Sequence, residues 1–215
     1  MQKTLLLLNS SLNIKKPLLK FDNIKIEYGE KRLISYSKGF NSLHKTEIYN
    51  KFNKVALIDN TTSKVQDIDS GLRNLLPKET AYLLGKHNKI GRKNKGAGML
   101  DSLQRYSEFF KEYDYIFYFE PRLILENPEF IINTLNKEYN VFTLESEKRV
   151  RTGYFGSKSR DLIEFVNSNS SDDLVKNNLH IELLMYEFYS DKNTLFLKDN
   201  ISLWKNYLSN KYEKY

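Results

Sequence analysis

Polar residues capable of chemistry stand directly after three apolar runs of this sequence. Asn9 follows LLLL, Asp59 follows KVALI, and Glu120 with Arg122 follows the aromatic run YIFYF. A carboxylate can take a proton or hold a cation, an amide forms hydrogen bonds, and an arginine binds oxyanions through two parallel N–H donors. Each pattern alone is typical of an ordinary turn. Their repetition after successive apolar runs predicts a ligand cleft.

A basic, glycine-punctuated segment adds a fourth group of candidates. It reads KHNKIGRKNKGAG over 86–98 and precedes a predicted helix. Its end, NKGAG, can bring Lys95 and backbone N–H groups to a phosphate at the start of that helix. The spacing matches neither a Walker loop nor the Gly-x-Gly-x-x-Gly fingerprint. An ordinary surface loop is the alternative.

The elements that must position these residues alternate between strands and helices. Apolar runs predict strands at 5–8, 54–61, 80–85, 114–119, 140–144 and 194–197. Helical spacing and capping residues predict helices at 30–48, 64–75, 99–110, after Asn127-Pro128, at 159–166 and at 176–189. The alternation predicts one α/β domain with a mostly parallel sheet flanked by helices. In such sheets ligands bind outside the carboxyl ends of the strands.

Composition narrows the class of protein. The 215 residues suit one domain, and a 40% hydrophobic content is that of a globular chain. The chain has no cysteine, which excludes disulfides and thiolate metal sites, and its three histidines lie far apart in sequence. The net charge of +7 favours an anionic partner, namely nucleic acid, nucleotide phosphate or anionic lipid. A lysine- and asparagine-rich composition without functional meaning is the alternative.

The start of the chain contains no targeting signal that we recognise. The apolar part of MQKTLLLLNSS is shorter than a secretion signal requires, and no small-residue cleavage site follows it. No stretch approaches the length of a membrane span. We therefore expect a cytoplasmic protein, with a peripheral position at the inner membrane face as the alternative.

Five segments together resemble a known family. They are RLISY, ALIDNT, NKGAG, YDYIFYFEPRLIL and RTGYFGSKS. Their order over residues 3–190 is similar to that of small bacterial glycosyltransferases with the GT-A fold, of a type that builds surface polysaccharide. The resemblance implies a nucleotide-sugar donor bound along the carboxyl edge of the sheet. It also implies a donor half at 1–125, an acceptor half at 126–200 and a basic aromatic tail at 201–215.

The resemblance assigns donor-binding roles to several positions. Asp59 matches the acid that contacts the nucleoside after the second strand. The donor loop matches Asn94, Lys95 and Gly96. We expect Asn9 to lie at the same edge of the sheet and to contribute to the same site.

The segment Glu120-Pro121-Arg122 matches the family's Asp-x-Asp motif and also departs from it. That motif supplies carboxylates to a divalent cation that neutralises the diphosphate. Here the second acid is replaced by Arg122, whose permanent charge can bind phosphate oxygens directly. We therefore predict no cofactor, with Mg²⁺ or Mn²⁺ as the open alternative. A plain ion pair between Glu120 and Arg122 at the strand end is another alternative.

The acceptor half contains the remaining candidates. Arg151 and Thr152 match the region that closes the donor pocket, so they are expected to contact pyrophosphate or acceptor. Glu182 is the expected catalytic base, because an acid in the apolar segment LHIELL is costly unless it faces a polar cleft. Glu120 is the second candidate catalytic acid. His180, two positions before Glu182, points elsewhere on a helix, so the two do not form a dyad.

The expected function is transfer of a sugar from a nucleotide-diphosphate donor to a surface-polysaccharide or lipid-linked acceptor. Two alternatives stay open. A nucleic-acid-binding module is favoured by the basic charge and 15 tyrosines, although many aromatics lie in segments better explained as core. A non-catalytic relative of the transferases, acting as an interaction subunit, is the other. We expect no nucleic acid among the partners.

The tail SLWKNYLSNKYEKY, at 202–215, is expected to contact a membrane or to pack on the domain. Its apolar residues fall near one side of a predicted helix, and lysines add positive charge; they are Leu203, Trp204, Tyr207 and Leu208, with Lys205, Lys211 and Lys214. Basic amphipathic helices lie in membrane interfaces. Packing of Trp204 and Leu208 back onto the domain is the favoured alternative.

Overall fold

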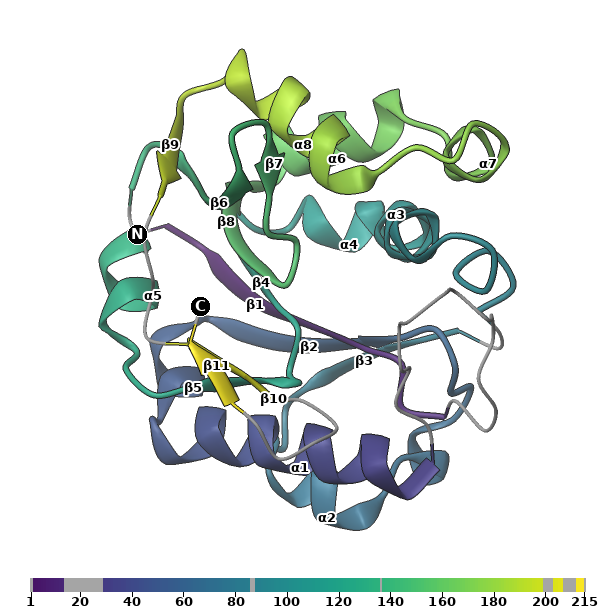
Figure 1. Cartoon of the computed structure of the whole chain (residues 1–215). Coiled ribbons are helices and arrows are strands. Elements are labelled where there is room, and N and C mark those ends of the chain that lie inside the picture. Colours follow the sequence, from purple (N-terminus) through teal and green to yellow (C-terminus); the bar gives the residue numbers. More distant parts are fainter. Residues whose placement is uncertain are drawn as a thin grey trace.

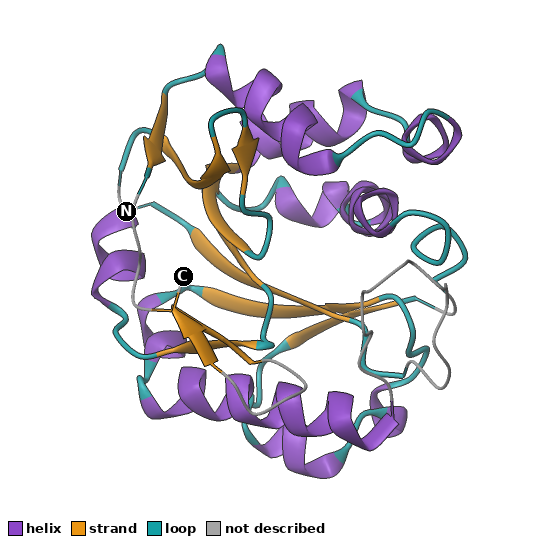
Figure 2. Cartoon of the chain, viewed as in Figure 1, coloured by secondary structure: helices purple, strands orange, loops and turns teal. Residues whose placement is uncertain are grey.

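The computed structural model describes residues 2–13, 29–85, 88–135, 137–198, 203–206 and 212–214. These residues form an α/β fold in which helices cover both faces of a central sheet (Figure 1). Figure 2 shows the same view by secondary structure, with the strands of the sheet running between two groups of helices. The predicted fold class is confirmed.

The central sheet is mixed and mostly parallel in its first half. Its strand order is β3-β2-β1-β4-β8-β6-β7, and β9 also pairs with β6. The strands are β1 (Thr4–Ser10), β2 (Lys54–Asp59), β3 (Ala81–Leu84), β4 (Tyr115–Phe119), β6 (Asn140–Ser146), β7 (Arg149–Val150), β8 (Tyr154–Lys158) and β9 (Thr194–Leu197). Strands β3, β2, β1 and β4 are parallel, whereas β8 runs antiparallel to β4. The carboxyl ends of the first four strands therefore share one edge.

The helices lie in two layers (Figure 1). They are α1 (Gly29–Lys45), α2 (Ser70–Asn74), α3 (Lys95–Arg105), α4 (Ser107–Phe110), α5 (Glu129–Thr134), α6 (Ser159–Ser168), α7 (Ser171–Lys176) and α8 (Ile181–Ser190), with 3₁₀ turns at Ile48–Lys51 and Val65–Asp67. Helices α1 and α2 cover one face of the sheet, and α3, α4, α6 and α8 cover the other.

The leucine run of β1 is apolar because it is buried on both faces. Leu6 and Leu8 belong to the core cluster that contains Phe40 of α1. Leu5 and Leu7 belong to the second cluster, on the side of α3 and α6. A central parallel strand covered by helices on both sides is uniformly hydrophobic rather than alternating. This burial fixes the register of β1, and with it the position of the polar residues that follow.

Several predicted helix boundaries were wrong. The helix expected over 64–75 is a 3₁₀ turn followed by the short α2. The helix expected over 99–110 begins at Lys95, because Asn94 caps it, and it is interrupted at Tyr106. The helix expected over 176–189 begins only at Ile181, since α7 ends at Lys176 and Asn178 has a φ of 49°, outside the helical region.

The helix expected in the tail was also wrong. Leu203–Asn206 (β10) and Tyr212–Lys214 (β11) are strands, and they form a three-stranded antiparallel sheet with β5, Leu123–Leu125 (Figure 2). In this sheet Trp204 pairs with Ile124. The unpaired backbone groups at the edge of β5 bind β10 as a neighbouring strand. Tyr207, Leu208 and Lys211 lie outside the described residues.

No helix in the described part of the chain is long and apolar enough to cross a bilayer.

Helix α1 touches the turn after β4 at a glycine. A Cβ atom at Gly39 would lie 2.0 Å from the carbonyl oxygen of Pro121 and 2.8 Å from that of Leu123. In the next turn of α1, the Ser42 hydroxyl accepts a hydrogen bond of 2.9 Å from the backbone N–H of Leu125. The turn that contains Glu120 and Arg122 therefore packs directly against the backbone of α1.

We predict that Gly39→Ala lowers the free energy of unfolding by about 1–3 kcal/mol, the usual cost of overpacking. The backbone of Pro121 must move to admit the methyl group, so the turn should shift as well. Urea denaturation measures the loss. Ile34→Ala, on the exposed side of the same helix, is the control and should change stability far less. Equal stability of Gly39→Ala and wild type would contradict this packing.

Candidate functional site

The ends of β1, β2 and β4 bring three of the predicted groups to one edge. In the parallel register Ser10 lies beside Asp59 and Leu8 lies beside Phe119. Asn9 therefore stands next to the position where Glu120 leaves β4. The observed strand order β2-β1-β4 thus gathers Asn9, Asp59 and Glu120 on adjacent strands, at the edge where parallel sheets bind ligands.

Asp59 holds the loop that follows β1. Its side chain is fully buried, at 0% exposure. The carboxylate accepts hydrogen bonds from the Ser10 hydroxyl and the Leu12 N–H, both at 2.7 Å, and from the N–H and hydroxyl of Thr61 at 2.8 and 2.6 Å. All of these partners belong to the chain itself. In this conformation Asp59 shapes the edge by positioning its neighbours.

Asn9 has an unused hydrogen-bond acceptor at the same edge. Its Nδ2 donates to the hydroxyl of Tyr118. Its Oδ1 is buried and has no hydrogen-bond partner among the described residues. Burial raises the pKa of Tyr118 well above its usual value, so that phenol stays protonated. Because an unpaired buried acceptor is costly, the Oδ1 of Asn9 is a candidate contact for a hydroxyl or N–H group of a ligand.

Glu120 and Arg122 form a partly buried ion pair. The Nε of Arg122 donates to the Oε1 of Glu120 at 2.7 Å, and Nη2 donates to the same oxygen. Each side chain is 21% exposed. Burial acts to raise the pKa of Glu120, but the positive charges of Arg122, Lys95 and Arg32 outweigh it and hold that pKa well below its ordinary value. Three cations therefore act on this one carboxylate at the edge of the sheet.

Arg32 and Tyr36 belong to this cluster, and sequence reasoning missed Arg32. Arg32 is only 5% exposed. Its guanidinium donates to the carbonyl oxygen of Ser11 and to the hydroxyl of Tyr36. That hydroxyl accepts a hydrogen bond of 2.9 Å from the N–H of Ser11. The sequence pattern that could have revealed Arg32 is its spacing: it lies four positions before Tyr36, so both residues share the apolar face of the predicted helix.

The predicted donor loop begins α3. Asn94 is its N-cap, and the Oδ1 of Asn94 accepts a hydrogen bond of 3.0 Å from the N–H of Ala97. Lys95 is exposed, yet close enough to Glu120 to lower the pKa of that carboxyl. The loop therefore contributes a positive charge to the cluster at the sheet edge.

The predicted acceptor segment also reaches this edge. The N–H of Glu120 donates to the carbonyl oxygen of Gly153 at 2.7 Å. Arg151 and Thr152 directly precede that residue, and the N–H of Arg151 donates to the carbonyl oxygen of Thr143 at 2.8 Å. Both side chains are half-buried. The segment thus lies against the turn that carries Glu120 and Arg122.

Glu182 lies in the first turn of α8, beside the residue that contacts the donor loop. It is half-buried, and its side chain forms no hydrogen bond or ion pair with any residue that the structure describes. His180 is the exposed N-cap residue of α8 and its side chain does not cap the helix. The two residues do not form a dyad, as expected from their spacing.

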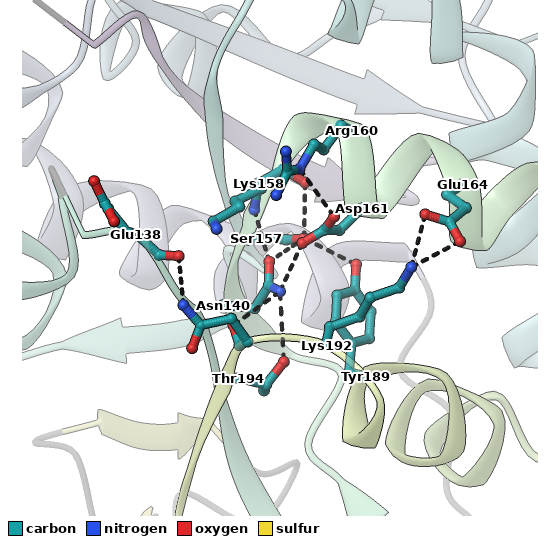
Figure 3. A network of polar contacts seen from close by, with 11 residues as sticks. Glu138, Asn140, Ser157, Lys158, Arg160, Asp161, Glu164, Tyr189, Lys192 and Thr194 are labelled. Atoms are coloured by element: carbon teal, nitrogen blue, oxygen red, sulfur yellow. Dashed lines mark hydrogen bonds and ion pairs between the residues drawn. The ribbon is translucent and has the colours of Figure 1, made fainter.

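A buried polar network holds the other end of α8 against the sheet (Figure 3). The Nδ2 of Asn140 donates to Asp161 at 2.9 Å, and its Oδ1 accepts from Ser157 at 3.1 Å. The Ser157 hydroxyl lies 2.8 Å from the hydroxyl of Tyr189, near the end of α8. This network joins β6, β8, α6 and α8, so the C-terminal end of the helix that carries Glu182 is held against the sheet.

Within the described residues, the two carboxylates at this edge, Asp59 and Glu120, are already engaged by the chain itself. Magnesium and manganese are held by several oxygen ligands, with at least one or two carboxylates. Glu120 is already paired with Arg122, and no cluster of three acidic or histidine side chains exists within the described ranges. The cations beside Glu120 would also repel a metal ion.

Comparison with known proteins identifies the fold. No protein-family model matches the chain, and no curated protein matches it significantly in sequence. One similar solved structure is that of a protein from Desulfovibrio desulfuricans G20 assigned as a nucleotide-diphospho-sugar transferase. The TM-score is 0.52 and the sequence identity 11%, and the match covers 93% of this chain and 81% of that one. A protein from Bacillus anthracis assigned as a glucose-1-phosphate thymidylyltransferase, in complex with a sucrose, has a TM-score of 0.54 and 12% identity, covering 95% and 89%.

These likenesses show a nucleotide-diphospho-sugar transferase-like fold, which is the GT-A-like fold that the sequence predicts. At 11–12% identity they show the fold alone. Function must therefore be argued from the side chains at the sheet edge.

We predict that the ion pair makes stability depend on pH. A carboxyl whose pKa is lowered by folding stabilises the protein above its unfolded pKa, near ~4.3, and the contribution disappears as the pH falls further. Wild type should exceed Glu120→Gln in unfolding free energy at pH 7, and the difference should shrink steadily below about pH 4.

Urea denaturation between pH 7 and pH 2.5 measures this difference. Glu108→Gln is the matched control, because Glu108 pairs with Lys111 in a highly exposed position and exposed pairs contribute little. A wild-type advantage over Glu120→Gln that stays constant across this range would contradict the assignment.

Proposed function

We propose that this protein is a glycosyltransferase that moves a sugar from a nucleotide-diphosphate donor to a surface-polysaccharide or lipid-linked acceptor. The observation that carries the proposal is the cluster of Arg32, Lys95 and Arg122 around Glu120, at the carboxyl edge of a sheet with this fold. A diphosphate is a compact anion, and this is where such a sheet binds its ligands.

The charge of the cluster supports direct recognition of phosphate. Arg122 presents a planar guanidinium suited to two parallel hydrogen bonds with a phosphate. Lys95 adds a point charge at the start of α3, whose N-terminal end favours anions. Glu120 holds Arg122 in place through the hydrogen bond from Nε. In this scheme Arg122 neutralises the leaving diphosphate, and the reaction needs no divalent cation.

The other residues have complementary roles in the proposal. Asn9 offers an unpaired oxygen to the nucleoside or its ribose, and Asp59 contributes by shaping the loop around it. Gly96 lets the donor loop approach its neighbours closely. Arg151 and Thr152, directly before the Gly153 carbonyl that binds the N–H of Glu120, are assigned to the acceptor side.

The proposed chemical step assigns a role to each group. The acceptor hydroxyl attacks the anomeric carbon, the bond from that carbon to the diphosphate oxygen breaks, and the nucleoside diphosphate leaves with the electron pair. Glu182 takes the proton of the hydroxyl as general base. Its half-buried carboxylate, without a partner among the described residues, is available for that role. Arg122 stabilises the charge that develops on the departing diphosphate.

The acceptor class rests on the sequence resemblance and on charge. A net charge of +7 suits an anionic lipid-linked acceptor or a membrane surface. The protein then acts in the cytoplasm, at the inner membrane face where such an acceptor lies. The strands of the tail are not an amphipathic helix, so any membrane contact by the tail must use a different geometry from the one first expected.

The alternatives have less support. Base stacking needs exposed aromatic rings, whereas the largest fully buried side chains of the described chain include Tyr36, Tyr115, Tyr154 and Tyr189. The fold alone does not separate a glycosyltransferase from a non-catalytic relative, because proteins of different function share it, as the thymidylyltransferase neighbour does. Ligand binding and product analysis separate these classes.

We predict that the protein binds nucleoside diphosphates without metal, and that Arg122→Ala weakens this binding roughly ten- to hundredfold, because a charged hydrogen bond contributes ~1.5–3 kcal/mol. Titration calorimetry with uridine, guanosine and cytidine diphosphates, in the presence of a chelator, measures the affinities. Arg122→Lys keeps the charge but loses the planar fork, so it should give an intermediate loss.

Arg160→Ala is the control for general charge effects, because its side chain is 78% exposed on α6, where it pairs with Asp161. It should leave the affinity unchanged. Absence of binding by wild type at millimolar concentration would refute the donor site. Binding that appears only with Mn²⁺ would refute the role of Arg122 in place of metal.

A further inference from the structure

The side chain of Asn94 links the donor loop to the segment before α8. Besides capping α3 through Oδ1, it uses Nδ2 to donate to the carbonyl oxygens of Leu174 at 3.2 Å and Leu179 at 3.1 Å. These carbonyls lie 80 and 85 positions away in sequence. All three contacts are within the chain, so Asn94 is occupied as a structural link.

A second contact joins the same two segments. A Cβ atom at Gly96 would lie 2.9 Å from the Cβ of Ile181 and 2.7 Å from its Cγ2. Ile181 is the first residue of α8 and is buried at 1% exposure. The donor loop therefore packs without a side chain against the turn that carries Glu182.

The far end of α8 is anchored independently. Tyr189 bonds to Ser157 in the network of Figure 3. Within the described chain, the start of α8 lacks side-chain capping, since His180 makes no cap hydrogen bond. The contacts from Asn94 and Gly96 are thus well placed to decide how firmly this first turn is held.

We propose that Asn94 is a positioning residue that couples the donor loop to the first turn of α8, so that a nucleoside diphosphate bound at Lys95 and Arg122 orders Glu182 for the acceptor. This inference rests on the proposed function, and it changes the role of Asn94 from the donor contact expected from sequence to a link between the two halves of the site. Coupling can be carried by a segment that contacts both sites, and the 94–96 segment is such an element.

Two substitutions separate the link from the helix cap. Asn94→Ser and Asn94→Asp both keep a side-chain oxygen that caps α3, and both remove the amide donors to Leu174 and Leu179. The serine variant adds no charge near the diphosphate, and the aspartate variant keeps the shape of asparagine. An effect common to both therefore belongs to the lost amide.

Amide hydrogen exchange of the full chain, with and without uridine, guanosine or cytidine diphosphate, tests the coupling. Suitable reporters are the N–H groups of Leu179, Leu183 and Leu184, which bond to Leu174 and His180. Without nucleotide, both variants should exchange about tenfold faster at these positions, as expected for two lost hydrogen bonds. Exchange in α3 should stay within about twofold of wild type because the cap is kept.

With nucleotide, wild type should gain protection both at 95–99 and at 179–184. The serine variant should keep the first gain and an affinity within about threefold of wild type, since a cap is retained, but should lose the second gain. If nucleotide protects 179–184 in both variants as much as in wild type, the coupling is overturned. If wild type binds no nucleotide, the proposed function fails instead, while the ligand-free exchange rates still show whether Asn94 holds α8.

Discussion

The ion pair between Glu120 and Arg122 is the interaction on which the candidate site depends. The backbone of this turn is held from two sides, by the Gly153 carbonyl that accepts the N–H of Glu120 and by Gly39, which leaves no room for a Cβ against Pro121. A rigid turn keeps a guanidinium at the edge of the sheet without a large entropic cost on binding.

The loop after β1 supports the same edge from the opposite side. Asp59 binds its backbone at Leu12, and Arg32 binds it at Ser11. Burying a carboxylate or a guanidinium is costly unless its hydrogen bonds are satisfied. Both groups meet that condition inside the chain, which points to a pre-organised edge. Pre-organised charges stabilise a developing anion without reorganisation at the moment of reaction.

Much of this arrangement could be predicted from the sequence, because the strands of the sheet are long apolar runs. Once β1, β2 and β4 are placed in parallel, Asn9, Asp59 and Glu120 must share an edge. The contribution of Arg32 was missed because a charged residue on an apolar helical stripe shows its purpose only when its partner, the Ser11 carbonyl, is known. The tail was wrongly predicted as a helix because its strand partner, β5, is distant in the sequence.

Asn94 shows the limit of local patterns in the candidate site itself. The sequence pattern predicts this helix only from residue 99, whereas the side chain of Asn94 caps a helix that begins at Lys95. Its bonds to Leu174 and Leu179 depend on parts of the chain that lie 80 and 85 positions away in the sequence. Local periodicity contains no information about such partners.

A crystal structure with a bound nucleoside diphosphate, grown in the presence of a chelator, tests the central claim most directly. The account predicts that the β-phosphate lies within hydrogen-bond distance of Arg122 and Lys95, with the nucleoside beside Asn9 and no cation between the phosphate and Glu120. A diphosphate bound elsewhere on the chain, or bound at this edge while Arg122 remains turned away from it, would contradict the account.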